Sequence, residues 1–197
     1  MPNALNEIML ADYVPGPQQG QWTYSYYAAL PDAGKRYEII DGVLYMISPS
    51  PDELHQKASM RIAYYLFSYI ELMGKGRIYT APFDVELSLN VVVQPDILAV
   101  LSENQNNIVH THIIGAPDLI VEILSPGTAS YDRSIKYATY ARTGVKEYWI
   151  ADPYQHSVEV SVLEKATYFS IGVFREQETI KSRIVPYLPI QVRSLFV

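Results

Sequence analysis

The sequence predicts an α/β (α+β) domain in which helices flank a mixed central sheet. Two long segments repeat their apolar residues at the spacing of a helix, and several shorter segments are continuously apolar or alternate, as strands do. A helix, several strands, a second helix and a further strand follow one another along the chain. This order of elements is typical of a sheet covered by helices.

The N-terminal segments predict a lead-in, a short helix and a hairpin. Residues 10–21 are rich in Pro, Gly and Gln, so we expect residues 1–21 to precede a single domain that spans residues 22–197. Residues 22–32 predict a short helix that Pro31 ends. Residues 36–48 contain two apolar runs around Asp41-Gly42, which is a strong signal for a tight turn between two strands.

A longer helix is expected over residues 50–74, with Ser50 or Asp52 as its N-cap and Gly74 at its end. Its expected buried stripe consists of Ala58, Ile62, Tyr65, Tyr69 and Leu72.

The remaining segments predict strands around a second helix. We expect strands within residues 77–89, 91–101, 118–125 and 147–153, and a helix over 128–144. The connection from 118–125 to 147–153 carries this helix and is long enough for a parallel crossover. The tail, residues 157–192, suggests two or three extra antiparallel strands.

The composition excludes several classes of protein. The chain has 197 residues, of which 49% are apolar and 18% are charged, as in ordinary globular domains. The absence of cysteine excludes a disulfide framework and a thiolate zinc site. No apolar stretch is long enough to span a bilayer and the N-terminus does not resemble a signal peptide, so we expect a cytoplasmic protein without a membrane partner.

The net charge of −6, from 21 acidic and 15 basic residues, argues against a broad nucleic-acid-binding surface. It does not exclude a small acidic pocket that holds a divalent cation, because the cation restores positive charge where a phosphate would bind.

Two carboxylates stand out because they lie in strand segments. Asp96 follows Pro95 at the start of an apolar run, although Pro-Asp is also a common turn pair. Glu122 alternates with Val121 and Ile123 and therefore shares a strand face with Leu124. A buried ion pair with a Lys or Arg would also account for Glu122.

Together these carboxylates predict a metal site. If their strands are neighbours in the sheet, Asp96 and Glu122 converge, and two close carboxylates repel unless a cation lies between them. Oxygen ligands of this kind select hard ions such as Mg²⁺ or Mn²⁺.

The same residues carry a resemblance to a known family. Pro95-Asp96, a spacer of 25 residues and then "ExL" from Glu122 to Leu124 resemble the PD-(D/E)xK nuclease signature with its lysine replaced. The blocks "RYEIIDGVLYMISPSPDELH", "QPDILAV", "GAPDLIVEILSPGTASYDRSIKYATYARTGVKEYWIADP" and "VEVSVL" resemble the Uma-two family of restriction-endonuclease-like proteins. The resemblance runs from about Trp22 to Leu163 and implies a restriction-endonuclease-like core with Asp96 and Glu122 as ligands of Mg²⁺.

In this motif the third charged position is Leu124, which cannot orient water or stabilise a phosphate. In members of the superfamily with this gap, the resemblance implies a lysine from another element, and Lys136 on the following helix is our candidate. The alternative is that Lys136 forms only a surface i,i+4 pair with Asp132. Asp132 either supports Lys136 or caps its helix.

Two further residues are candidates. Glu38 is a candidate extra metal ligand or water-orienting base, and the alternative is an outward-facing strand residue. His55 lies near the buried stripe of the first long helix and is either a core histidine or a group that supports a metal ligand. Glu147 and Asp152 are interpreted as structural.

The leading hypothesis is a Mg²⁺-dependent endonuclease that hydrolyses phosphodiester bonds in nucleic acid, with DNA as the expected substrate. A homodimer would suit cleavage of duplex DNA. One alternative is a non-catalytic binding module that keeps the nuclease fold, which Leu124 and the acidic net charge favour. Another is a structural domain whose Glu122 pairs with an arginine such as Arg133.

Overall fold

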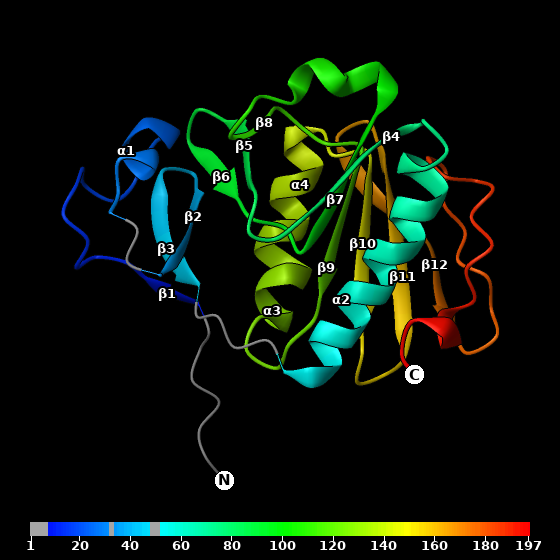
Figure 1. Ribbon diagram of the computed structural model, residues 1–197. Helices are drawn as coiled ribbons and strands as arrows, with labels where there is room; N and C mark the ends of the chain where they lie inside the picture. Colours follow the sequence, from blue (N-terminus) through cyan, green and yellow to red (C-terminus); the bar gives the residue numbers. More distant parts are fainter. Residues whose placement is uncertain (1–7, 32–33, 48–51) are drawn as a thin grey trace, which may run out of the picture.

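The computed structural model describes residues 8–31, 34–47 and 52–197, and Figure 1 shows their arrangement. The helical elements are α1 (Tyr24–Ala28), α2 (Glu53–Leu66), α3 (Ala129–Tyr131) and α4 (Tyr137–Thr143), the π-helical turns η1 (Phe67–Glu71) and η3 (Asp132–Lys136), and the 3₁₀ turns η2 (Ser102–Asn107) and η4 (Val192–Ser194). The strands are β1 (Ile8–Leu10), β2 (Arg36–Ile40), β3 (Val43–Ile47), β4 (Gly76–Thr80), β5 (Asp84–Ser88), β6 (Val91–Val93), β7 (Ile97–Leu101), β8 (His112–Ile114), β9 (Leu119–Ile123), β10 (Glu147–Asp152), β11 (Ser157–Glu164) and β12 (Thr167–Arg175).

The central sheet, sheet B, has the strand order β12-β11-β10-β9-β7-β4. Strands β9 and β10 are parallel, and α3, η3 and α4 form the crossover between them, as the sequence predicts. Strand β7 runs antiparallel to β9, with Ile97 opposite Val121. This register brings the residue before β7, Asp96, next to Glu122.

The second sheet, sheet A, has the order β1-β3-β2-β6-β5-β8. Strands β2 and β3 form the predicted hairpin, and Asp41 and Gly42 at its turn have φ values of 54° and 73°, which suit this type of tight turn. The sequence does not predict that the hairpin continues through β6 and β5 into a separate sheet. The α+β class with a mixed sheet and flanking helices is confirmed.

Sheet B is covered on both faces. One face packs against α2 and the C-terminal segment, and the other packs against α3, α4 and strands of sheet A. Figure 1 shows α2 and α4 on either side of β9 and β10. Because successive strand residues point to opposite faces, Val121 and Ile123 enter one apolar cluster and Ile120 and Leu124 enter the other. Glu122 shares the face of the second cluster, as predicted.

The first long helix differs from its prediction at its C-terminal end. Asp52 is the N-cap, and its side chain accepts a hydrogen bond from the His55 N–H at 2.9 Å, whereas Ser50 lies outside the described residues. The buried stripe continues from Ile62 to Leu66 and Ile70, and the prediction for Leu72 is wrong, since that side chain is 70% exposed. The π-helical turn η1 is wider than an α-helical turn, so a spacing of four residues keeps the stripe on the buried face.

The two ends of the domain also differ in detail from the prediction. Strand β1 pairs with β3, and Ala11 and Trp22 are buried against the hairpin, although the sequence predicts no strand in this segment. Strands β11 and β12 are the predicted C-terminal pair, whereas residues 184–192 form no strand and pack onto sheet B through buried side chains. Among the described residues, no helix is long and apolar enough to cross a membrane.

Candidate active site

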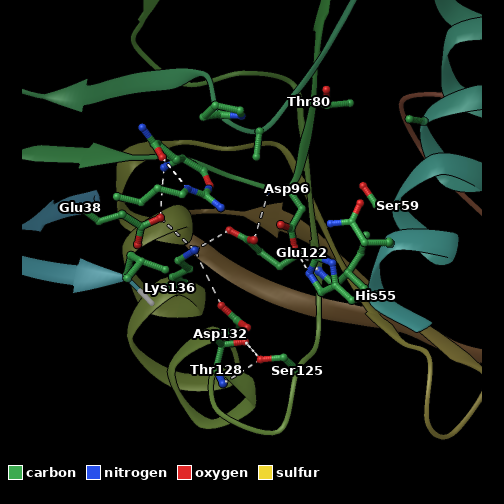
Figure 2. Close-up of a pocket in the computed structure, with 18 of the residues that line it drawn as sticks. Glu38, His55, Ser59, Thr80, Asp96, Glu122, Ser125, Thr128, Asp132 and Lys136 are labelled. Atoms are coloured by element: carbon green, nitrogen blue, oxygen red, sulfur yellow. Dashed lines mark hydrogen bonds and ion pairs between the residues drawn. The ribbon is translucent and has the colours of Figure 1, made fainter. Parts of the chain in front are cut away.

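A cleft of about 450 Å³ collects the polar residues that the sequence singles out. Its lining comes from both sheets, from α2 and from η3, and Figure 2 shows the labelled carboxylates around Lys136. The predicted site residues in this lining are Glu38, His55, Asp96, Glu122, Asp132 and Lys136. All six are therefore brought together, although they are spread over nearly one hundred residues of sequence.

Asp96 and Glu122 are neighbours because β7 and β9 pair. The Asp96 N–H lies 3.4 Å from Glu122 Oε2, and the Ile123 N–H donates to Asp96 Oδ2 at 2.8 Å. The Ile123 bond means that Asp96 does more than shape a turn. The expected convergence of the two carboxylates is confirmed, and their role as metal ligands stays a prediction.

Lys136 is buried and contacts carboxylates from three elements. Its Nζ atom lies 2.9 Å from Glu122 Oε1, 3.1 Å from Glu38 Oε1 and 3.8 Å from Asp132 Oδ1. The alternative of a surface pair with Asp132 is wrong, since the Lys136 side chain is only 8% exposed. Burial alone would lower the pKa of Lys136, but the surrounding carboxylates, Glu122 first, hold this pKa well above its usual value.

Glu38 faces inward, so the alternative of an outward-facing strand residue is wrong. Its side chain is buried, and Oε1 accepts a hydrogen bond from the Gln94 N–H at 3.0 Å in addition to its ion pair with Lys136. The other oxygen, Oε2, is buried and has no hydrogen-bond partner among the described residues. A buried carboxylate oxygen without a partner is costly, so it marks a position where a water or cation would be stabilised.

His55 supports Asp96. Its Nε2 atom lies 3.2 Å from Asp96 Oδ2, whereas Nδ1 is buried without a partner among the described residues. Burial tends to lower the pKa of His55, but the hydrogen bond and charge of Asp96 raise it overall. In return, although burial tends to raise the pKa of Asp96, His55 and the Ile123 N–H hold it below its usual value. Asp96 is therefore ionised and oriented.

Asp132 supports Lys136 and does not cap the helix. The N-cap of α3 is Thr128, whereas Asp132 lies buried in η3 near Lys136. Burial raises the pKa of Asp132 to about 6, although Lys136 and the Thr128 hydroxyl oppose this shift.

Glu122 is the most strongly perturbed carboxylate. Its Oε1 atom accepts hydrogen bonds from Lys136 Nζ at 2.9 Å and from the Tyr140 hydroxyl at 2.6 Å. Burial, together with the charges of Asp96 and the other carboxylates, raises the pKa of Glu122 to about 8 despite the opposing effect of Lys136. The cleft thus holds four carboxyl groups against the basic side chains of Arg36, His55 and Lys136, so acidic groups outnumber basic ones.

The donor chemistry fits a hard divalent cation. Asp96 and Glu122 supply oxygen ligands, and Asp96 Oδ1 and Glu38 Oε2 have no hydrogen bond in the described part of the chain. A divalent ion would also offset the excess negative charge. Within the described ranges, no group of three His, Cys, Asp or Glu side chains is already arranged around a common metal position. The cleft therefore matches the predicted ion by its chemistry and charge.

Three polar residues of the site are not among those that the sequence predicts. Arg36 lies two residues before Glu38 on β2, so strand alternation places both on one face. Gln94 is adjacent to the Pro95-Asp96 pair and binds Glu38 through its backbone. Tyr140 follows Lys136 by four residues, a helical spacing that could have indicated its place beside Glu122.

Charged residues outside the cleft are engaged elsewhere. Glu147 is buried and accepts hydrogen bonds from Trp149 Nε1 and the Arg183 N–H, both at 2.7 Å, which agrees with a structural role. Asp152 accepts backbone N–H bonds in the turn after β10. Arg133 pairs with Glu159 at 2.9 Å, so the hypothesis that Arg133 neutralises Glu122 is wrong.

The α+β core and its acidic cleft define a protein with a restriction-endonuclease-like nuclease fold. The chain belongs to the Uma2 family, whose model carries the description "Putative restriction endonuclease" and matches residues 24–193. The resemblance drawn from the sequence is thereby confirmed.

The structure is similar to the crystal structure of "a putative nuclease belonging to DUF820" from Anabaena variabilis. The TM-score is 0.74, and the match covers 89% of this chain and 97% of that chain at 20% sequence identity. At this identity the likeness shows the fold. No curated protein matches the sequence.

Proposed function

We propose that the protein is an endonuclease that hydrolyses phosphodiester bonds of nucleic acid, with DNA as the substrate and Mg²⁺ or Mn²⁺ as the cofactor. The observation that carries this proposal is the position of Lys136. Its ammonium group lies between Glu38 and Glu122, in the cleft that also holds Asp96. An ammonium group and two acidic ligands are the chemical components that the nuclease motif requires.

Asp96 and Glu122 would hold the metal. When bound, the ion supplies Lewis-acid polarisation of a phosphoryl oxygen and a lowered pKa for a bound water. His55 orients Asp96 through its Nε2 atom, and Tyr140 orients Glu122 through its hydroxyl group. Support of this kind fixes the direction in which ligand oxygens point.

Lys136 and Glu38 would act on the substrate and on water. The Lys136 ammonium would stabilise the negative charge that develops on the phosphoryl oxygens, and stabilisation of this kind is often the largest contribution to catalysis. The free Oε2 atom of Glu38 would accept a hydrogen bond from the attacking water and orient it. Asp132 helps to hold Lys136 in place.

One of the two observations that favour the non-catalytic alternative, besides the acidic net charge, is Leu124 at the motif's third position. Leu124 is buried in an apolar cluster. However, Lys136 reaches Glu122 from the following helix, a position from which it would supply the cation that Leu124 cannot.

The experiment that tests the proposal is cleavage of plasmid DNA and of labelled oligonucleotides, DNA and RNA, in Mg²⁺ or Mn²⁺. Asp96→Asn should reduce the rate by about 100-fold or more, because it removes a charged metal ligand with little change of shape. Asp12→Asn, at an exposed site in the N-terminal segment, is the matched control and should leave the rate unchanged. Equal activity of Asp96→Asn and the wild type would refute the proposed site.

A further inference from the structure

Arg36 is a basic side chain of the cleft that the proposed chemistry does not use. Three basic side chains line the cleft: Arg36, His55 and Lys136. His55 binds Asp96, and Lys136 binds carboxylates. By contrast, no carboxylate of the described residues lies within ion-pair distance of the half-buried Arg36 guanidinium. A guanidinium held beside a cleft without an acidic partner is available to an anionic ligand.

Gln94 holds the Arg36 guanidinium in a fixed position. Arg36 Nε donates to Gln94 Oε1 at 2.9 Å, and Arg36 Nη2 donates to the Gln94 carbonyl oxygen at 3.3 Å. These two bonds use two of the five N–H groups of the guanidinium. Three N–H groups remain for a ligand, enough for the two parallel hydrogen bonds that an arginine makes to a phosphate.

The Gln94 amide is itself locked by the residues behind it. Its Nε2 atom donates to Asp84 Oδ1 at 2.7 Å and to the Tyr27 hydroxyl at 2.9 Å. A carboxylate needs a donor and an arginine needs an acceptor, so only one orientation of the amide satisfies both Asp84 and Arg36. The guanidinium is thus held in advance of ligand binding, which lowers the entropy lost when a ligand binds.

The backbone of Gln94 connects this arrangement to the proposed catalytic residues. The Gln94 N–H donates to Glu38 Oε1, which pairs with Lys136, and Asp96 follows two residues later. Arg36 and Glu38 also lie on one face of β2. A ligand in contact with Arg36 therefore lies in the same cleft as the proposed metal ligands.

We propose that Arg36 anchors a backbone phosphate of the bound nucleic acid, with Gln94 as its positioning residue. This inference rests on the proposed nuclease function. A phosphodiester is the anion that suits both parts of the cleft, because it can approach a cation held by the carboxylates while an adjacent phosphate accepts hydrogen bonds from a planar guanidinium. A contact to a backbone phosphate does not depend on the base sequence, so it would contribute to affinity and to the position of the nucleic acid in the cleft.

Fluorescence anisotropy with labelled 16-nucleotide DNA, single-stranded and duplex, tests the anchor. The titrations are made in EDTA and in Mg²⁺ on the Glu122→Gln background, which removes a proposed metal ligand and so prevents cleavage. Arg36→Gln should weaken binding by about tenfold. It should also reduce the slope of log Kd against log salt by about one phosphate contact. Arg36→Lys keeps the positive charge but loses the planar pair of N–H donors, so its affinity should lie between those of the parent and the Arg36→Gln variant.

Two further variants separate anchoring from general effects. Arg77→Gln removes an arginine of β4 that is half exposed and pairs with Glu71, so it should leave the affinity and the salt slope unchanged. Gln94→Met should weaken binding less than Arg36→Gln, and the double variant should bind no worse than Arg36→Gln alone, since both act through one guanidinium. Equal binding and salt slope in Arg36→Gln and in its parent would overturn the anchor while the nuclease proposal stands.

Nuclear magnetic resonance with dimethyl phosphate, a minimal phosphodiester, distinguishes failure of the anchor from failure of the nuclease proposal. The Arg36 Nη–H signals should shift as dimethyl phosphate is added, because these groups are the ones left free by Gln94, and the Arg77 signals should not. If oligonucleotides bind the parent and the Arg36 signals shift, but the wild type cleaves neither DNA nor RNA, the anchor stands and the nuclease proposal fails. If neither probe binds, the anchor is overturned as well.

Discussion

Lys136 Nζ lies 2.9 Å from Glu122 Oε1, although the two residues are separated by 14 positions and belong to a helix and a strand. Residue 124, where the motif places its charged group, is a leucine buried in an apolar cluster. The ammonium group is therefore delivered from the crossover that follows β9. The π-helical turn η3 carries both Lys136 and Asp132, and π-helical turns often occur at functional sites.

Metal binding should depend on Glu122. We expect calorimetry with Mn²⁺ to give one or two bound ions per chain for the wild type and a loss of this binding in Glu122→Gln, because an amide does not supply the charge that a hard cation requires. Glu147→Gln is the matched control, since Glu147 is buried away from the cleft. Wild-type affinity in the folded Glu122→Gln variant would exclude Glu122 as a ligand.

Removal of the Lys136 ammonium should affect stability in a pH-dependent way. Lys136→Met leaves Glu38 and Glu122 buried without their cation, and loss of one partner of a buried pair costs about 3–5 kcal/mol. Denaturant unfolding at pH 8 should show this loss. The loss should be smaller at pH 5, because burial raises the pKa of Glu122 to about 8 and its protonated carboxyl group does not need a cation. Lys57→Met, which breaks an exposed i,i+4 pair, should cost about 0.5 kcal/mol or less. An equal loss at both pH values would contradict the expected coupling.

The metal-free protein should become less stable as the pH rises from about 5 to 8. The pKa of Glu122 is about 8 in the folded protein, against about 4.3 for an unperturbed glutamate, and the pKa of Asp132 is about 6. The folded state therefore binds more protons than the unfolded state in this range, so the free energy of unfolding falls with increasing pH. One pKa unit corresponds to about 1.4 kcal/mol, so we expect a decrease on the order of 1 kcal/mol or more.

Unfolding in EDTA at several pH values checks this prediction. Glu122→Gln should flatten the curve over the same range, because the amide does not titrate. A curve that rises from pH 5 to 8, or one that Glu122→Gln leaves unchanged, would show that the excess negative charge of the cleft does not act on stability.

Replacing Leu124 by the lysine of the motif should destabilise the protein without increasing its activity. Leu124 is 3% exposed and packs among apolar and tyrosine side chains, so Leu124→Lys would bury a second ammonium group without a partner of its own. We expect a loss of about 3 kcal/mol or more in the free energy of unfolding and no gain in cleavage. Leu124→Met, which conserves volume, should cost less than about 1.5 kcal/mol. A stable, more active Leu124→Lys variant would show that the third position is still usable.

Much of the site could be predicted because local patterns report it directly. Alternation in the strand assigned Glu122 to a face. Asp96 and Glu122 were expected to converge if their strands were neighbours in the sheet, and β7 and β9 are neighbours. The turn at Asp41-Gly42 and the crossover to β10 were also predicted, since turn residues and loop length depend on local sequence.

Other features depend on tertiary packing and leave little trace in sequence. The sequence leaves open whether Glu38 faces outward, because both faces of β2 carry apolar residues. Only the position of sheet A relative to η3 shows that Glu38 faces Lys136. The exposure of Leu72 follows from the π-helical turn η1, which helical periodicity does not anticipate. No local pattern places Arg36 in the site, because its partner, Gln94, lies 58 positions away in the sequence.

The three residues Gln94, Pro95 and Asp96 carry the chain from Val93 at the end of β6 in sheet A to Ile97 at the start of β7 in sheet B. Gln94 is hydrogen-bonded to β2 of sheet A, and Asp96 is hydrogen-bonded to β9 of sheet B. Lys136 contacts both Glu38 of sheet A and Glu122 of sheet B. A rotation of one sheet relative to the other would therefore change the distance between these two carboxyl groups. One residue inserted into this crossing would separate the two halves of the site without removing any of its side chains, so its geometry depends on chain length as much as on chemistry.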